Sequence, residues 1–247
     1  KSNALQNVMN YFRSIIEKLI DRVIIPLLPF HIFGIFANMT HGGQVSSILS
    51  VFAKVFVMII ALHIVYLIIQ YTAAGAVSRQ NPFKLLKTMA PAYFTALGTQ
   101  SSASTIPVTL KHTKQLGVRN KVADFSVPLF ATIHLSGSTI TLVSCSIAVM
   151  MLQGHSVTIG ALLPFILMLG VTMIAAPGVP GGAVMAALGL LETMLGFDAT
   201  MLSLMIALYL AQDSFGTACN VTGDGALTVL ADKASGKDKP VKQLKVS

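Results

Sequence analysis

The stretch AAPGVPGG, residues 175–182, decides the fold, because it puts three glycines and two prolines in the middle of a long apolar segment. The run from residue 125 to residue 191 contains no Asp, Glu, Lys or Arg. Because proline and glycine interrupt helices, each side of the stretch has room for roughly 15 helical residues, fewer than the ~20 needed to cross a bilayer. Residues 157–192 therefore predict two short helical arms that enter the membrane and turn back.

The composition indicates a membrane protein. Of the 247 residues, 54% are hydrophobic and only 11% are charged, and the mean hydropathy is +0.75. A soluble domain has about a quarter of its residues charged. The net charge of +8 does not indicate nucleic-acid binding, because the basic residues lie in short clusters between apolar segments. Cys145 and Cys219 both lie inside apolar segments, so we expect packing residues and no disulfide framework.

The clusters of Lys and Arg predict the topology of the apolar segments, which cover residues 11–39, 45–74, 82–110, 122–152, 157–191 and 199–230. Basic residues gather at 79–87, 111–121 and 233–245, whereas residues 38–44, 153–158 and 192–200 have none. The positive-inside rule assigns the first group to the cytoplasm and the second to the outside. The third and fifth segments must then each begin and end on one side of the membrane.

The third segment has a breaker-rich midpoint of its own, GTQSSASTIP at residues 98–107. Irregular backbone at such a tip is tolerated only where it is buried in protein or lines a cavity. Two oppositely oriented re-entrant hairpins, each followed by a longer span, form an inverted repeat that is typical of secondary transporters. Tightly packed helix pairs with irregular loops are the alternative interpretation. The predicted fold class is an all-α membrane protein.

The last apolar segment has a polar face. Asp213, Thr217, Asn220 and Asp224 stand at i, i+4, i+7 and i+11, so all four lie on one helical stripe. A carboxylate is costly in lipid, and such a stripe marks an ion or substrate path by default. The alternative is that the two aspartates hydrogen-bond neighbouring helices. Because the segment 199–230 that carries the stripe contains no lysine or arginine, the stripe favours cations that arrive from solution.

The two other polar places fit an amino acid and a cation. The tip at residues 98–107 carries four hydroxyl groups, those of Ser101, Ser102, Ser104 and Thr105. A helix that begins there would also present backbone N–H groups suited to a carboxylate. The stretch ATIHLSGSTIT, residues 131–141, predicts partial unwinding that would free carbonyls for a cation. His134 within it is a candidate proton carrier or weak ligand, or else a hydrogen-bonded structural residue.

Four motifs, SSASTIPVTL (101–110), PLFATIHLSGST (128–139), PGVPGGAV (177–184) and QDSFGTACNVTGD (212–224), give the chain its resemblance to a family. In order and spacing, residues 11–233 resemble the dicarboxylate/amino acid:cation symporters, the family of the glutamate transporter homologues. The resemblance implies the C-terminal portion of a longer, multi-pass inner-membrane protein that forms a homotrimer. It implies a scaffold and trimerisation helix at 1–43, a transport domain at 44–232 and a basic cytoplasmic tail at 233–247. Within the transport domain it implies a helix at 45–75, hairpin 1 at 82–117, a broken helix at 122–152, hairpin 2 at 157–192 and a final helix at 199–231.

The resemblance also implies the site residues. The substrate would contact Ser101, Ser102, Ser138, Gly178, Val179, Asp213, Thr217 and Asn220. Its ammonium would lie at Asp213 and its carboxylate at Ser102 and Ser138, with Gly178 and Val179 in the hairpin 2 gate. One sodium ion would be held by Asp224 with the backbones of Phe130, His134 and Asn220. A second would be held by backbone oxygens of Thr132, Leu135, Met173, Ile174 and Ala176.

Two departures from the family pattern matter. Gly216 stands where members that carry acidic substrates have an arginine, so an anionic substrate side chain would lose its charge-assisted partner. The motif is nearest to that of the bacterial serine/threonine sodium symporters. Ser136 stands where the family has an aspartate, so a third sodium site is not expected and fewer ions would be coupled, unless His134 brings in a proton.

These observations predict a sodium-coupled symporter of a neutral amino acid that works by an elevator mechanism, with no cofactor besides the coupled ion. Proton coupling, or uptake of a dicarboxylate, an acidic amino acid or cystine, stays open as an alternative. An intramembrane hydrolase is disfavoured because no motif pairs a serine nucleophile with His134. A channel is disfavoured because helix breakers paired with single acidic residues favour a closed binding site. We therefore expect a transporter and not an enzyme.

Overall fold

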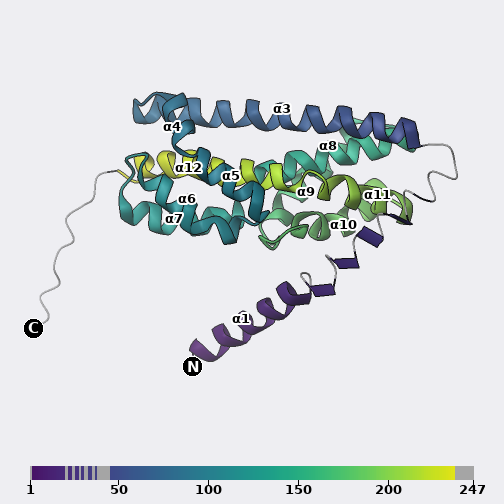
Figure 1. Ribbon diagram of the computed structural model, residues 1–247, viewed down its shortest axis with the longest axis horizontal. Coiled ribbons are helices and arrows are strands. Elements are labelled where there is room, and N and C mark those ends of the chain that lie inside the picture. Colours follow the sequence, from purple (N-terminus) through teal and green to yellow (C-terminus); the bar gives the residue numbers. More distant parts are fainter. Residues whose placement is uncertain are drawn as a thin grey trace, which may run out of the picture. The chain divides into compact units, whose positions relative to one another are not determined.

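The computed structural model describes residues 2–19, 22–23, 26–27, 29–30, 33–34, 37 and 45–236, and every regular element in these ranges is a helix (Figure 1). The predicted scaffold helix at 1–43 and the predicted tail at 233–247 therefore lie partly outside the described residues. The chain forms two compact units. One, called here the Asp213 unit, comprises residues 1–61 and 138–213; the other, the Asp224 unit, comprises residues 62–137 and 214–247.

The Asp224 unit is built around a pair of helices with a very short connection. The helix α3 (Val45–Ser78) leads into α4 (Pro82–Thr88). Asn81 caps α4, and its Oδ1 accepts hydrogen bonds from two backbone amides. The next helix, α5 (Ala90–Thr99), ends at Gln100 in the left-handed conformation with φ of 50°. Then α6 (Ser102–Lys114) is capped by Ser101, whose Oγ accepts from the backbone amide of Ser104 at 3.2 Å. The turn is thus Gln100 and Ser101 alone, shorter than the predicted tip at 98–107.

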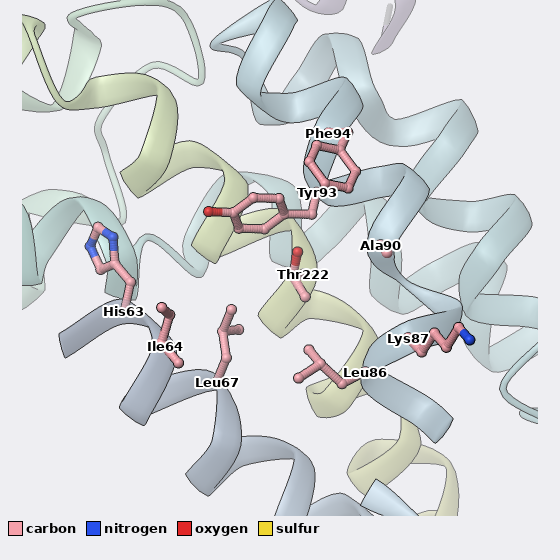
Figure 2. A pocket seen from close by; sticks show the side chains of 9 residues that line it. All are labelled: His63, Ile64, Leu67, Leu86, Lys87, Ala90, Tyr93, Phe94 and Thr222. Carbon is pink, nitrogen blue, oxygen red and sulfur yellow. The ribbon is translucent and has the colours of Figure 1, made fainter. Parts of the chain in front are cut away.

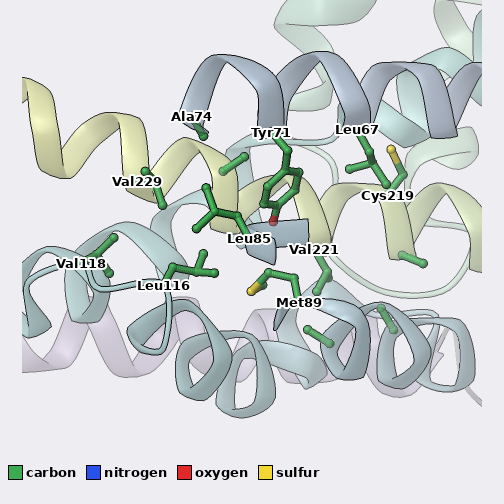
Figure 3. Close-up of a cluster of buried hydrophobic side chains, with 14 of the residues drawn as sticks. Leu67, Tyr71, Ala74, Leu85, Met89, Leu116, Val118, Cys219, Val221 and Val229 are labelled. Carbon is green, nitrogen blue, oxygen red and sulfur yellow. The ribbon is translucent and has the colours of Figure 1, made fainter. Parts of the chain in front are cut away.

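The same unit is closed by α7 (Asn120–Ile133), which packs on α6, and by α12 (Asp213–Ala234). The start of α7 is tied to the end of α12, because Arg119 Nε donates to Asp232 Oδ1 at 2.7 Å and Arg119 Nη2 donates to the Asp232 carbonyl at 2.8 Å. Tyr71 of α3 is buried in the core of this unit, and its hydroxyl donates to the Thr222 carbonyl at 2.7 Å (Figure 3). The other labelled side chains of this core include Leu67, Leu85, Met89, Leu116 and Val221.

The Asp213 unit repeats the pattern of a helix pair followed by a further helix. Its helices include α1 (Ser2–Leu19), most of α8 (Ser136–Leu152), α9 (Ile159–Met173), α10 (Gly182–Leu195) and α11 (Ala199–Leu210). Here α10 packs on α9 and on α11, as α6 packs on α5 and on α7 in the Asp224 unit. The two arms α9 and α10 have 15 and 14 residues. At 1.5 Å per residue each is about 22 Å long, less than the ~30 Å of hydrocarbon in a bilayer.

Two stretches of the described chain are long and apolar enough to cross a membrane, Leu49–Ser78 and Asn120–Leu152. The second is interrupted, because α7 ends at Ile133 and α8 begins at Ser136. His134 has φ −104° and ψ 85°, which is not helical. The helix breaks in the stretch whose sequence predicts unwinding.

The sequence predicts one helix at 199–231, and the structure differs from this prediction. The segment forms two helices, α11 and α12, separated by a turn at Ala211 and Gln212. The backbone amide of Gln212 bonds to the carbonyl of Tyr209 at 2.9 Å, which tightens the last turn of α11. Asp213 is therefore the first residue of a helix and not a residue in the middle of one.

Candidate functional site

The first candidate site surrounds Asp213 and lies within the Asp213 unit. Asp213 is 4% exposed, and both of its carboxylate oxygens accept a hydrogen bond. Oδ1 accepts from the Tyr209 hydroxyl at 2.8 Å, and Oδ2 accepts from the backbone amide of Gly181 at 2.6 Å. The Tyr209 hydroxyl is also hydrogen-bonded to the side chain of Ser138. We call these four residues the Asp213 cluster.

The Asp213 cluster keeps a negative charge available for a ligand. Both donors to the carboxylate, a tyrosine hydroxyl and a backbone amide, are neutral and leave its charge in place. An ionised carboxylate has about four lone-pair positions, so two donors leave room for others. Asp213 also opens α12, and the N-terminal end of a helix favours a negative charge. An ammonium group is the ligand that suits such a buried, oriented carboxylate.

The connection between α9 and α10 brings its backbone to Asp213. Gly181 has φ of 71°, and a Cβ at this position would lie 3.0 Å from Leu210 Cδ2. A glycine is therefore required for the turn that points the amide at the carboxylate. Gly178 and Val179 lie in the same connection and are half-buried, and the Val179 carbonyl accepts from the amide of Gly182 at 2.9 Å.

The second candidate site surrounds Asp224 and lies within the Asp224 unit. Asp224 is fully buried, and its Oδ1 is 2.8 Å from His134 Nδ1. Its Oδ2 has no hydrogen-bond partner among the described residues. The Nε2 atom of His134 is 2.8 Å from Ser136 Oγ and 3.3 Å from Gln70 Nε2. Because the Gln70 amide can only donate, the partners favour a histidine with its proton on Nδ1, facing the carboxylate.

The break between α7 and α8 is held in place by α12. Gly137 donates its backbone amide to Asn220 Oδ1 at 2.7 Å, and its carbonyl is 3.0 Å from His63 Nε2. Asn220 is predicted to meet the substrate, and its side-chain oxygen is bonded to the backbone of the break. Gly223 allows this packing, because a Cβ there would lie 2.6 Å from both Gln70 Oε1 and His134 Cε1. We call Asp224, His134, Ser136 and Gln70 the Asp224 cluster.

The Asp224 cluster has the chemistry of a cation site. A buried carboxylate oxygen without a donor is costly, and a cation would supply the missing partner. The C-terminal end of α7, which carries the negative end of a helix dipole, lies at the same break. One of its carbonyls, that of Phe130, accepts from the amide of His134 at 2.8 Å. Carboxylate and carbonyl oxygens are the ligands that hard cations prefer.

The remaining predicted residues divide between the two units. Ser101, Ser102, Thr217 and Gly216 are buried in the Asp224 unit, the first two at the start of α6. For the predicted second sodium site, Thr132 and Leu135 lie in the Asp224 unit, and Met173, Ile174 and Ala176 lie in the Asp213 unit. The carbonyl of Met173 accepts from the amide of Ala176 at 3.2 Å, and the hydroxyl of Thr132 donates to the Leu129 carbonyl at 2.7 Å.

A separate cavity of about 250 Å³ lies within the Asp224 unit. Figure 2 shows Thr222 among its lining side chains, which are those of His63, Ile64, Leu67, Leu86, Lys87, Ala90, Tyr93, Phe94 and Thr222. The Thr222 hydroxyl has no hydrogen-bond partner within the described part of the chain. The lining is mostly apolar and contains no carboxylate to hold an ammonium, so we do not assign the substrate to this cavity.

Sequence reasoning missed Tyr209, Gln70 and His63. His63 and Gln70 lie in α3, seven residues apart, with Tyr66 between them, and the Gln70 amide donates to the Tyr66 hydroxyl at 3.0 Å. Polar side chains at i, i+3 and i+7 share one helical face, and in an apolar helix that pattern was a usable signal. Tyr209 stands four residues before Asp213, and the single helix predicted for residues 199–231 would have placed the two side chains on one face.

Long apolar helices, one of them broken, and buried carboxylates that have neutral or histidine partners are features typical of secondary transporters. The chain belongs to the sodium:dicarboxylate symporter family, whose family model matches residues 1–234. This membership confirms the family predicted from the motifs, and the family model and the relatives describe transporters and not enzymes. The chain is accordingly a membrane protein.

Individual relatives are serine/threonine transporters. The chain is 28% identical over 233 residues to the serine/threonine transporter SstT of Acinetobacter baumannii, covering 92% of this chain and 57% of the relative. It is 26% identical over 239 residues to the serine/threonine transporter SstT of Acinetobacter baylyi, covering 95% of this chain and 59% of the relative. The chain thus spans somewhat more than half the length of these relatives.

Proposed function

We propose that the protein is a secondary transporter that takes up a neutral amino acid together with sodium. The observation that carries the proposal is the pair of buried carboxylates on α12. Within the described residues, Asp213 and Asp224 are bonded to a tyrosine, a backbone amide and a histidine, and not to a lysine or arginine. Two buried carboxylates with such donors are suited to two positive charges from solution, the substrate ammonium and a sodium ion.

The substrate would lie with its ammonium at Asp213 and its carboxylate at hydroxyls of the helix starts. Ser102 is the first residue of α6, capped by Ser101, and Ser138 lies in the first turn of α8, so the hydroxyls of Ser102 and Ser138 stand where backbone amides favour an anion. Thr217 and Asn220 would add polar contacts, and Gly178 and Val179 would cover the site from the α9–α10 connection. Gly216 leaves no cation there for an acidic side chain, which supports a neutral substrate. The names of the serine/threonine transporter relatives point the same way.

Sodium would bind at Asp224, with oxygens of Phe130, His134 and Asn220. A second ion would take backbone oxygens of Thr132, Leu135, Met173, Ile174 and Ala176. The unpartnered Oδ2 of Asp224 supports the first of these sites. No organic cofactor is part of this proposal.

The architecture proposed for this function is an elevator in the inner membrane. Residues 44–232 would move as a transport domain against a scaffold that includes residues 1–43, in a homotrimer. The segments 82–117 and 157–192 would be re-entrant hairpins of opposite orientation. The lengths of α9 and α10, 15 and 14 residues, support this, because neither arm is long enough to span.

A competition panel tests the substrate class. Uptake of labelled serine into proteoliposomes that contain the full-length protein is driven by an inward sodium gradient. Each unlabelled amino acid is then added in turn as a competitor. The proposal expects small neutral amino acids to compete strongly and aspartate and glutamate to compete weakly. Selective competition by aspartate or glutamate would overturn the argument from Gly216. Uptake that follows a pH gradient and not sodium would assign the coupling to protons, a role for which His134 is placed beside Asp224.

A further inference from the structure

Tyr209 links two groups that the proposed function assigns to opposite charges of the substrate. It is fully buried, and its hydroxyl donates to Asp213 Oδ1 at 2.8 Å. The same hydroxyl is hydrogen-bonded to the side chain of Ser138. Asp213 is the proposed partner of the ammonium, and Ser138 is a proposed partner of the carboxylate. The Tyr209 hydroxyl is therefore hydrogen-bonded to both side chains that would bind the charged groups of the substrate.

The link has a geometric consequence. In an α-amino acid the ammonium and the carboxylate are attached to a single carbon atom, whereas a β-amino acid has one more carbon between them. Groups held at a fixed separation discriminate between these two spacings, and groups free to shift discriminate less. Gly181, bonded to the other oxygen of Asp213 at 2.6 Å, completes the fixation of the carboxylate plane.

We propose that Tyr209 is a positioning residue that sets the separation of Asp213 and Ser138 and thereby selects α-amino over β-amino acids. The inference rests on the proposed function and deepens it, because it names the substrate feature that this part of the site measures. Tyr209 acts through its two neighbours.

The test compares serine with isoserine, its β-amino isomer, in the full-length protein. Inhibition constants of both compounds are measured on labelled serine uptake into proteoliposomes at saturating sodium, for the wild type and for Tyr209→Phe. Tyr71→Phe is the matched control, because Tyr71 is equally buried and its hydroxyl also makes a hydrogen bond, at 2.7 Å to the Thr222 carbonyl in the other unit. Thermal unfolding of all three proteins is recorded in parallel.

We expect the wild type to prefer serine, with a larger inhibition constant for isoserine than for serine. Tyr209→Phe should reduce the ratio of the isoserine constant to the serine constant on the order of tenfold, since a hydrogen bond to a charged group is lost. Tyr71→Phe should keep the wild-type ratio. A ratio unchanged in Tyr209→Phe, or a wild type that does not discriminate, overturns the inference while the proposed function stands. A wild type that takes up no amino acid overturns the proposed function and the inference with it.

A second variant covers the case in which Tyr209→Phe does not fold. Ser138→Ala removes the other end of the same link and leaves Tyr209 bonded to Asp213. It should also reduce the ratio of the inhibition constant of isoserine to that of serine. Equal changes in both inhibition constants would instead indicate a general loss of affinity, which contradicts a role in spacing.

Discussion

Gly223→Ala should damage the Asp224 cluster, because α12 touches the cluster at this glycine. A Cβ there would lie 2.6 Å from Gln70 Oε1, 2.6 Å from His134 Cε1 and 3.3 Å from Gln70 Nε2. Normal contacts lie near 3.5–4.0 Å, so two atoms must each move by about 1 Å. Overpacking of this kind costs about 1–3 kcal/mol, partly offset by the ~1 kcal/mol that alanine gains over glycine in a helix. The net loss of stability should be about 0–2 kcal/mol.

The substitution should also weaken sodium binding, because the displaced imidazole is the one that faces Asp224 at 2.8 Å. A loss of about 1.4 kcal/mol in the free energy of sodium binding lowers the sodium affinity tenfold. At a loss of this size, half-maximal uptake should require on the order of ten times more sodium. The assay is sodium-dependent serine uptake in proteoliposomes. Gly189→Ala is the control, because a Cβ there meets nothing within 4 Å among the described residues. An unchanged sodium requirement in Gly223→Ala would refute this account of the cluster.

Further substitutions test the other parts of the account. Gly216→Arg should let aspartate compete for uptake and should lower the affinity for serine. Serine uptake that aspartate does not inhibit in this variant would count against the selectivity argument. Asp213→Asn should abolish saturable uptake, since the ammonium loses a charged partner; wild-type kinetics would exclude Asp213 from the site. Asp232→Asn should lower the stability by about 1–2 kcal/mol, measured by thermal unfolding, because Arg119 donates to its carboxylate at 2.7 Å and the side chain is buried. In that variant the serine to isoserine preference should stay at the wild-type value, and a change in it would argue against a purely structural role.

The fold was predictable where breakers interrupt apolar runs. Pro177, Gly181 and Gly182 mark the connection between α9 and α10, and the unwinding predicted around His134 corresponds to the end of α7. The interruption of the last helix at Ala211 and Gln212 was not predictable, because neither residue is a helix breaker. That turn depends on local backbone hydrogen bonding.

The site was predictable in part. The acids of α12 stand out by periodicity, because charges in apolar helices are rare. Their partners do not stand out: the approach of Gln70 to His134 joins residues 64 positions apart, and the amide of Gly181 is a backbone group with no signal in a side-chain pattern. Tertiary packing also decides that the side-chain oxygen of Asn220 accepts from the amide of Gly137, which helical periodicity cannot show.

The most direct test of the central claim is serine uptake by the full-length protein in proteoliposomes under separately imposed gradients. The account predicts that an inward sodium gradient drives serine above its external concentration, that a proton gradient alone does not, and that Asp224→Asn removes the sodium effect. Serine accumulation of equal size without sodium, or an Asp224→Asn protein with unchanged sodium dependence, would contradict it.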